Sequence, residues 1–156
     1  MSGMFRYACG FLFLLFHGVM SPVFGKDVKV LIRVLYAAFV AEQGSAMCTV
    51  PSINLSESDR VIFINAKNYA QWIKQKVSTD LSDDDVQYVL KSAADRAREE
   101  MLEVVRVLKS NPPDKEYLEL FRWCTTNMKP IADKVVRTYV DHPDVIDKLI
   151  EDAKHD

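Results

Sequence analysis

The 156-residue sequence predicts an all-α fold, a small antiparallel four-helix bundle that follows an N-terminal export leader. Three observations lead to this prediction. All five glycines lie before residue 47, so the rest of the chain has little means of making tight turns with positive φ. Apolar residues recur at helical spacing in four later segments. The segments between them are short and rich in Pro, Ser and Asp.

Two apolar runs precede the predicted bundle, at residues 5–25 and 28–48. The first run has one arginine near its start and a short apolar core. The second has a basic start, an apolar core and small residues near its end. Each pattern is typical of a secretion signal. The candidate cleavage sites are Gly25–Lys26 for the first run and Ala46–Met47 for the second.

The cations just after the first run, Lys26, Lys29 and Arg33, favour the second run as the working signal. If the first run were the signal, these cations would be exported, against the positive-inside bias. They are instead typical of the basic segment that begins a signal, here the second run. The preferred interpretation assigns residues 1–46 to the leader and residues 47–156 to the helical domain. In the competing interpretation residues 5–25 are the signal or a retained anchor, and residues 28–43 form an apolar helix of the mature protein. The alternative signal segments are 1–25 and 28–46.

The cysteines agree with export to an oxidising compartment. Cys48 and Cys124 are an even pair in the predicted domain, so we predict a disulfide between an extended N-terminal arm and the third helix. It would close a loop of about 77 residues, worth at most ~4 kcal/mol in chain entropy. A lipid on Cys48 is opposed by Met47, because a lipoprotein signal has a small residue there. A metal pair is opposed by the lack of further ligands at suitable spacing.

The extended arm, residues 49–58, leads into the first predicted helix. Ser56 and Asp59 have the form of a capping box, and the helical spacing of apolar residues continues to about Val77.

The second predicted helix covers about residues 83–109 and carries a continuous apolar stripe. Ser82 with Asp85 repeats the capping pattern at its start, where the helix dipole favours acidic residues.

The third helix is predicted over residues 113–140, with a kink or brief interruption at Pro130, because its apolar spacing continues through the proline. Asp141 or His142 is expected to cap a last helix that has Pro143 in its first turn.

The chemistry that the sequence excludes is informative. Residues 47–156 carry a net charge of −4, which argues against a nucleic-acid partner or an anionic membrane surface. Without glycine after residue 46, the domain has no P-loop or dinucleotide-binding motif. Glu99 and Glu100 are expected on the surface, and His142 is expected at a turn rather than in a catalytic pair. We therefore expect no enzyme activity, no cofactor and no metal site.

Three aromatic residues, Tyr69, Trp72 and Trp123, are the candidate lining of a ligand pocket between helices. At such helical spacing, aromatic residues more often belong to the core than to a pocket.

The segment CTTNMKPIADKVVRTYVDHPDVIDKLIEDA, residues 124–153, resembles the end of the small periplasmic immunity proteins of type VI secretion (Tai-type). Those proteins have a cysteine, a helix that ends in an aliphatic-x-x-Tyr stretch, an x-Pro turn and a last helix. The chain lacks the family's C-terminal Pro-Cys and ends in Lys-His-Asp. The resemblance implies a periplasmic protein with a protein partner. The matching positions are Cys124, Val135, Val136, Tyr139, Pro143 and Leu149.

The sequence thus predicts a periplasmic or secreted protein that works by binding. The first expectation is a protein-binding module, either an inhibitor, an immunity protein or a chaperone, with a protein partner or a second copy of itself. The second is a small-molecule binder or sensor with a pocket between helices. No membrane span is expected in the mature chain unless residues 5–25 are retained.

Overall fold

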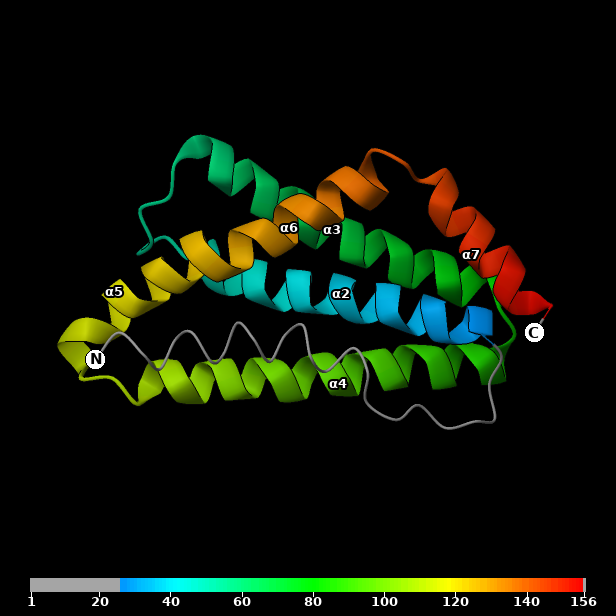
Figure 1. Cartoon of the computed structure of the whole chain (residues 1–156), viewed down its shortest axis with the longest axis horizontal. Coiled ribbons are helices and arrows are strands. Elements are labelled where there is room, and N and C mark those ends of the chain that lie inside the picture. The colour runs from blue at the N-terminus through cyan, green and yellow to red at the C-terminus, as the bar shows by residue number, and fades with distance from the viewer. Residues whose placement is uncertain (1–25, 156) are drawn as a thin grey trace.

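The computed structural model describes residues 26–155, and within that range the fold is all-α, with five helical rods and no strands (Figure 1). The fourth rod is divided by two π-helical turns. In chain order the elements are α2 (Lys26–Cys48), α3 (Glu57–Asp80), α4 (Asp83–Lys109), the rod of α5 (Pro113–Trp123), η2 (Cys124–Met128), α6 (Lys129–Val135) and η3 (Val136–Val140), and α7 (Asp144–Lys154).

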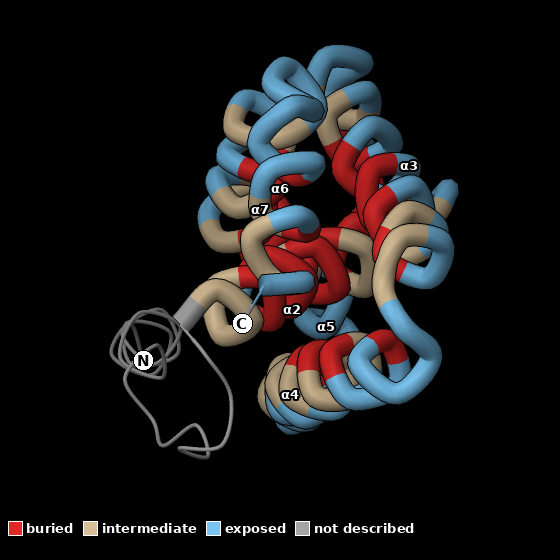
Figure 2. Tube along the Cα trace, turned by 90° about the vertical axis from the view of Figure 1, so that its right-hand side faces the viewer, coloured by how far each residue is buried: buried red, intermediate tan, exposed pale blue. Residues whose placement is uncertain are grey.

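Helix α2 is the centre of the fold. It packs most extensively against α3 and α4, which touch each other little, and it also contacts η2, α6 and α7. The tube coloured by burial shows α2 enclosed by the other helices (Figure 2). The structure is therefore a set of helices arranged around α2, and not a four-helix bundle in which each helix has equal neighbours.

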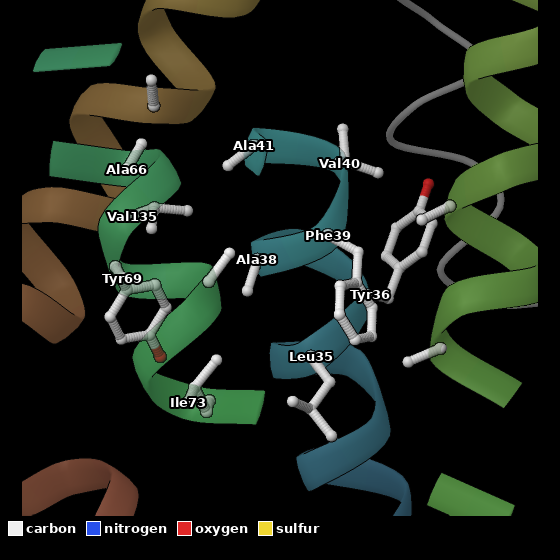
Figure 3. Close-up of a cluster of buried hydrophobic side chains, with 14 of the residues drawn as sticks. Leu35, Tyr36, Ala38, Phe39, Val40, Ala41, Ala66, Tyr69, Ile73 and Val135 are labelled. Atoms are coloured by element: carbon white, nitrogen blue, oxygen red, sulfur yellow. The ribbon is translucent and has the colours of Figure 1, made fainter. Parts of the chain in front are cut away.

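The sequence of α2 explains its central position. Leu31, Leu35 and Ala38 are fully buried, and buried residues occur on every side of the helix, as expected for a helix that is apolar all round. Ala38 and Ala41 face α3, whereas Tyr36 and Val40 face α4 (Figure 3). By length and composition alone Asp27–Cys48 could also cross a membrane, but more than half of its apolar window is buried inside the protein.

The position of α2 bears on the predicted domain boundary. Residues 28–46, assigned above to the leader, form most of α2, and this helix packs against α3 and α4. The structure agrees with the competing interpretation of an apolar helix over residues 28–43. The expected N-terminal arm is in fact the linker between α2 and α3, in which Ile53 and Leu55 are buried.

The predicted helices after residue 56 are present, and their caps differ in detail. Ser56 Oγ accepts a hydrogen bond from the backbone N–H of Asp59 at 3.2 Å, which confirms the first cap. Ser82 precedes α4, but its hydroxyl bonds the Asp85 carboxylate and caps no backbone group. Pro143 stands at the N-cap of α7 and not in its first turn.

The expected interruption of the third predicted helix is present as a π-helical turn before Pro130. In η2 the backbone N–H of Lys129 donates to the carbonyl of Cys124, five residues back. A second π-helical turn, η3, ends the rod, where the N–H of Asp141 donates to the Val136 carbonyl at 3.1 Å. Such turns add a residue to the helix and rotate the side chains that follow.

The predicted disulfide between Cys48 and Cys124 is confirmed. Both residues are fully buried, with their Cα atoms 5.6 Å apart. The bond joins the C-terminal end of α2 to the start of η2. Nearby, a Cβ atom added to Gly44 would lie 2.0 Å from Met128 Sδ, so the glycine allows the rod to approach α2 closely.

Candidate functional site

A small pocket of about 250 Å³ opens between α3 and the end of the fourth rod. Helix α3 forms one wall with Asn65, Asn68, Tyr69 and Trp72. These positions are spaced i, i+3, i+4 and i+7, so they share one face of the helix. The wall is therefore built by a single helical stripe.

The opposite wall comes from a distant part of the sequence. Tyr139 and Val140 of η3 and Pro143 of the following turn complete the lining. The π-helical turn and the N-cap proline together end the rod at this point. The pocket therefore depends on the packing of the rod's end against α3.

Three aromatic rings form a continuous series in this pocket. Tyr69 and Tyr139 are stacked, with ring centroids 5.6 Å apart and planes 11° apart. Trp72 is tilted against Tyr69 at a centroid distance of 5.7 Å. Tyr69 is 4% exposed and Trp72 is 37% exposed, so the series runs from the core to solvent.

The Tyr69 hydroxyl is buried and has no hydrogen-bond partner among the described residues. Burial, and to a lesser extent the nearby Tyr139, raises the pKa of this hydroxyl above its usual value of 10.0. Burial also raises the pKa of Tyr139. Both hydroxyls are therefore protonated at physiological pH, and that of Tyr69 is a donor without an acceptor.

A cation lies beside the outer aromatic ring. Lys76 Nζ is 5.7 Å from the centroid of Trp72. The same ammonium group is paired with Asp80 at 3.7 Å and with Asp147 of α7. Hydrogen bonding to Asp147 raises the pKa of Lys76. The rim of the pocket thus already holds a positive charge, which carboxylates balance.

Exposed apolar side chains continue from the pocket along α3. Val61 and Ile64 are about half exposed, and Ile64, Asn68 and Trp72 are spaced four residues apart. Val140 is exposed on the opposite wall. We call the pocket together with Val61, Ile64 and Val140 the pocket surface.

The three aromatic residues singled out from the sequence do not form one group. Tyr69 and Trp72 lie together in the pocket, whereas Trp123 is buried beside the disulfide cysteine and is not part of the lining. Sequence reasoning missed the two asparagines, although the helical stripe through Tyr69 and Trp72 includes them. It also missed Tyr139 as a pocket residue, because its place follows from tertiary packing.

The other residues considered for chemistry have simpler positions. Glu99 is exposed, but Glu100, which was expected on the surface, is half-buried, and burial raises its pKa to about 7. His142 is exposed at the turn before α7. Among residues 26–155, no group of three or more His, Cys, Asp or Glu side chains is placed to hold a metal ion.

The two candidate cleavage sites differ in their surroundings. The Ala46–Met47 bond lies inside α2, where Ser45 is fully buried. Lys26 is the first residue of α2, and Gly25 lies outside the described residues.

Comparisons of the chain with protein-family models, with curated proteins and with solved structures gave no match.

Proposed function

We propose that this protein is an exported protein-binding module and that its partner binds the pocket surface. The observation that carries the proposal is a pocket bordered by exposed apolar side chains, with Trp72 at its rim. Binding hot spots in protein interfaces are rich in tryptophan and tyrosine and pair with pockets that exclude water. Contiguous apolar surface on a small protein is typical of an interaction site.

Export is the second part of the proposal, and the disulfide supports it. Disulfides persist mainly in oxidising compartments such as the periplasm. Because α2 is packed into the core from Leu31 onward, we propose that the working signal is the run at residues 5–25. The exported protein then keeps α2. N-terminal sequencing of the exported protein should find a start at or before Lys26, and a start at Met47 would contradict this.

The partner class follows the expectations from the sequence. An inhibitor, an immunity protein and a chaperone each need an exposed binding surface, and the resemblance to type VI secretion immunity proteins also implies a protein partner. The matching positions of that resemblance include Tyr139 and Pro143, which line the pocket. A second copy of the chain would use the same apolar surface.

The proposal can be tested by affinity capture with the exported, C-terminally tagged protein. Wild type is compared with Trp72→Ala, which alters the pocket surface, and with Leu102→Ala as a matched control. Leu102 is 59% exposed on α4 and does not line the pocket. A tryptophan hot spot contributes ~2 kcal/mol or more, so Trp72→Ala should weaken the affinity for the partner at least about 30-fold.

The result that supports the proposal is one partner, identified by mass spectrometry, that wild type and Leu102→Ala retain and Trp72→Ala loses. Equal capture by all three proteins would contradict the proposed surface. Sedimentation of the untagged protein tests the homodimer, which Trp72→Ala should weaken and Leu102→Ala should not.

The pocket also supports the second candidate function, a small-molecule binder. The aromatic rings of Tyr69, Trp72 and Tyr139 in its lining favour a ligand with an apolar body. The volume of about 250 Å³ lies below the ~300–1,000 Å³ of pockets for drug-sized ligands, so a free ligand would have to be small. Ligand-dependent fluorescence of Trp72 in a Trp123→Phe background would detect such binding.

A further inference from the structure

The outer side of α3 carries almost no charge. Of the residues that α3 exposes between Val61 and Gln75, only Lys67 is charged. The exposed side of α4, by contrast, is charged along its length, as expected for a solvated helix face. Depletion of charge, together with aromatic residues, distinguishes the centre of a protein interface from the remaining surface. The uncharged residues that α3 exposes, here called the α3 seam, are Val61, Ile64, Asn65, Asn68, Gln71, Trp72 and Gln75.

The α3 seam follows a heptad repeat. Val61, Asn68 and Gln75 are seven residues apart and correspond to the a positions. Ile64 and Gln71 correspond to the d positions between them. In paired helices the a and d positions face the partner helix, and the stretch from Val61 to Gln75 is about 21 Å long. The seam therefore suits a single partner helix of about two heptads.

One edge of the α3 seam is basic. Arg60, Lys67 and Lys74 are also seven residues apart and correspond to the g positions beside the seam. No acidic residue occurs in α3 between Arg60 and Lys74, although the whole chain has a net charge of −2. Lys74 pairs with Glu42 of α2 at 2.9 Å, whereas Lys67 is exposed and forms no salt bridge within residues 26–155. The basic edge can therefore bind carboxylates of a partner.

The basic edge argues against a second copy of α3 on the seam. In an antiparallel pair of helices the g positions face each other, so Arg60 would face Lys74 and Lys67 would face its own counterpart. In a parallel pair the g positions face the e positions, which are Asn65 and Trp72 and offer no negative charge. Charged residues at e and g positions set the choice of partner. The pattern therefore favours a different chain with an acidic edge.

We propose that the α3 seam binds one helix of the protein partner, which has an uncharged seam of its own and acidic residues seven apart along one edge. These carboxylates pair with Arg60 and Lys67, while Trp72 packs against the other edge of the partner helix, beside the pocket. The Asn68 amide in the middle of the seam bonds across it and fixes the register. This inference rests on the proposed protein-binding function and names the chemistry of the partner.

The test uses two synthetic peptides and the exported full protein. Each peptide has two heptads with Leu at the a and d positions, and a lactam bridge on the opposite face keeps the short helix folded. One peptide carries Glu at both edge positions and the other carries Lys, so that like charges keep each from pairing with itself. By fluorescence anisotropy, the Glu peptide should bind at least about tenfold more tightly than the Lys peptide. Attraction to the net charge of the acidic chain alone would favour the Lys peptide.

Lys67→Glu reverses the charge at the middle of the basic edge. This variant should lose the preference for the Glu peptide and bind the Lys peptide at least about fivefold more tightly than wild type does. The matched control is Arg98→Glu on the exposed side of α4, which changes the net charge equally and should leave the preference unchanged. Equal effects of the two substitutions would overturn the role of the basic edge. Wild type that prefers the Lys peptide, or binds neither, would overturn the inference.

Two further measurements locate the bound peptide. The NMR signal of the Trp72 indole should shift when the Glu peptide binds, whereas that of Trp123, which is buried outside the seam, should not. Ile64→Ala should weaken the binding at least about fivefold, and Leu102→Ala on α4 should not. Equal binding by both variants would overturn the inference, because the peptide would then bind elsewhere. A wild-type dimer in sedimentation that Ile64→Ala weakens would overturn it in favour of a second copy.

The failure of this inference is distinguishable from that of the proposed function. If a partner is captured in a Trp72-dependent manner but the Glu peptide is not preferred, the acidic helix is wrong and the binding function stands. If the Glu peptide binds in a Lys67-dependent manner but no partner depends on Trp72, the proposed function is wrong and the assignment of the seam stands.

Discussion

Helices α2 and α3 both carry apolar side chains on more than one face, but only those of α2 are covered. Helix α3, α4, the fourth rod and α7 surround α2, so that even Leu31 and Leu35 on different turns are fully buried. Helix α3 buries one face, with Phe63 and Ile73, and exposes Ile64 and Trp72 on another. Apolar residues on a second face of a helix are therefore buried in the core in α2 but exposed to solvent in α3.

The difference shows which apolar residues bear on stability and which bear on binding. Covered side chains contribute to the free energy of folding in proportion to the area removed from water. Uncovered ones contribute little to folding and leave apolar surface available to a partner. Mutations in α2 should therefore change stability, and mutations on the outer face of α3 should change binding.

The largest expected effect is the loss of folding when α2 is removed. A fragment of residues 47–156 lacks the helix that α3 and α4 share as a partner. Each buried Leu, Ile, Val or Phe is worth ~1.5–3 kcal/mol, and a domain is stable by only ~5–15 kcal/mol in total. Circular dichroism of this fragment should show no cooperative unfolding, whereas residues 26–156 should unfold cooperatively. A 47–156 fragment that unfolds cooperatively would show that the other helices fold without α2, as expected if α2 were part of a leader.

The next effect compares one residue from each helix. Leu35→Ala on α2 removes a fully buried side chain and should lower the free energy of unfolding by ~2–5 kcal/mol. Ile64→Ala on α3 shortens a side chain that is 44% exposed and should change it by less than ~0.5 kcal/mol. Urea denaturation of both variants measures the difference. Similar losses would mean that the outer face of α3 is part of the folding core.

Gly44→Ala tests how closely the fourth rod packs against α2. The added methyl group would overlap Met128 Sδ, so the Met128 side chain or the rod that carries it must shift. Overpacking of this kind costs ~1–3 kcal/mol, partly offset by ~1 kcal/mol because alanine favours the helix. We expect a net loss of up to ~2 kcal/mol, measured by urea denaturation.

The matched control for this prediction is the same substitution in a Met128→Ala background. There the methyl group enters space that the shortened side chain has left, so Gly44→Ala should become neutral or stabilising. An equal loss in both backgrounds would show that Met128 is not the cause.

Segments with a clear helical spacing of apolar residues predicted the fold better than the apolar run at residues 28–48. Helix α4 has the same limits in the prediction and in the structure, because its apolar residues keep the helical spacing from one end to the other. The packing of α2 was not predicted by the preferred interpretation, because a short apolar run with a basic start is typical both of a signal and of a core helix. Periodicity cannot distinguish the two, and the partners that cover α2 lie far away in the sequence.

The candidate site was predictable only on its α3 side. Tyr69 and Trp72 stand out by composition, and Asn65 and Asn68 follow from helical spacing. The wall that contains Tyr139 depends on the π-helical turn that rotates the end of the rod. The spacing of apolar residues in the sequence does not predict a π-helical turn.

The smallest effect concerns the buried hydroxyl of Tyr69 on α3. Tyr69→Phe removes a buried hydroxyl that has no partner among the described residues, so it should raise the free energy of unfolding by about 1 kcal/mol at pH 7. Burial raises the pKa of Tyr69 above 10.0 in the folded protein only. Above pH 10 the unfolded chain loses this proton first, so wild-type stability should fall as pH rises and the variant should lose less.

The control for this prediction is Tyr117→Phe, which removes a hydroxyl that has a partner. Tyr117 Oη accepts a hydrogen bond from the backbone N–H of Asn54 at 3.3 Å, and its side chain is 44% exposed. Its loss should lower stability by a few tenths of a kcal/mol, opposite in sign to the effect of Tyr69→Phe. Urea denaturation at pH 7 and pH 10.5 gives both comparisons. If both variants lose stability equally, the Tyr69 hydroxyl has a hydrogen-bond partner in solution. The buried face of α3 would then leave no polar group unpaired at this position.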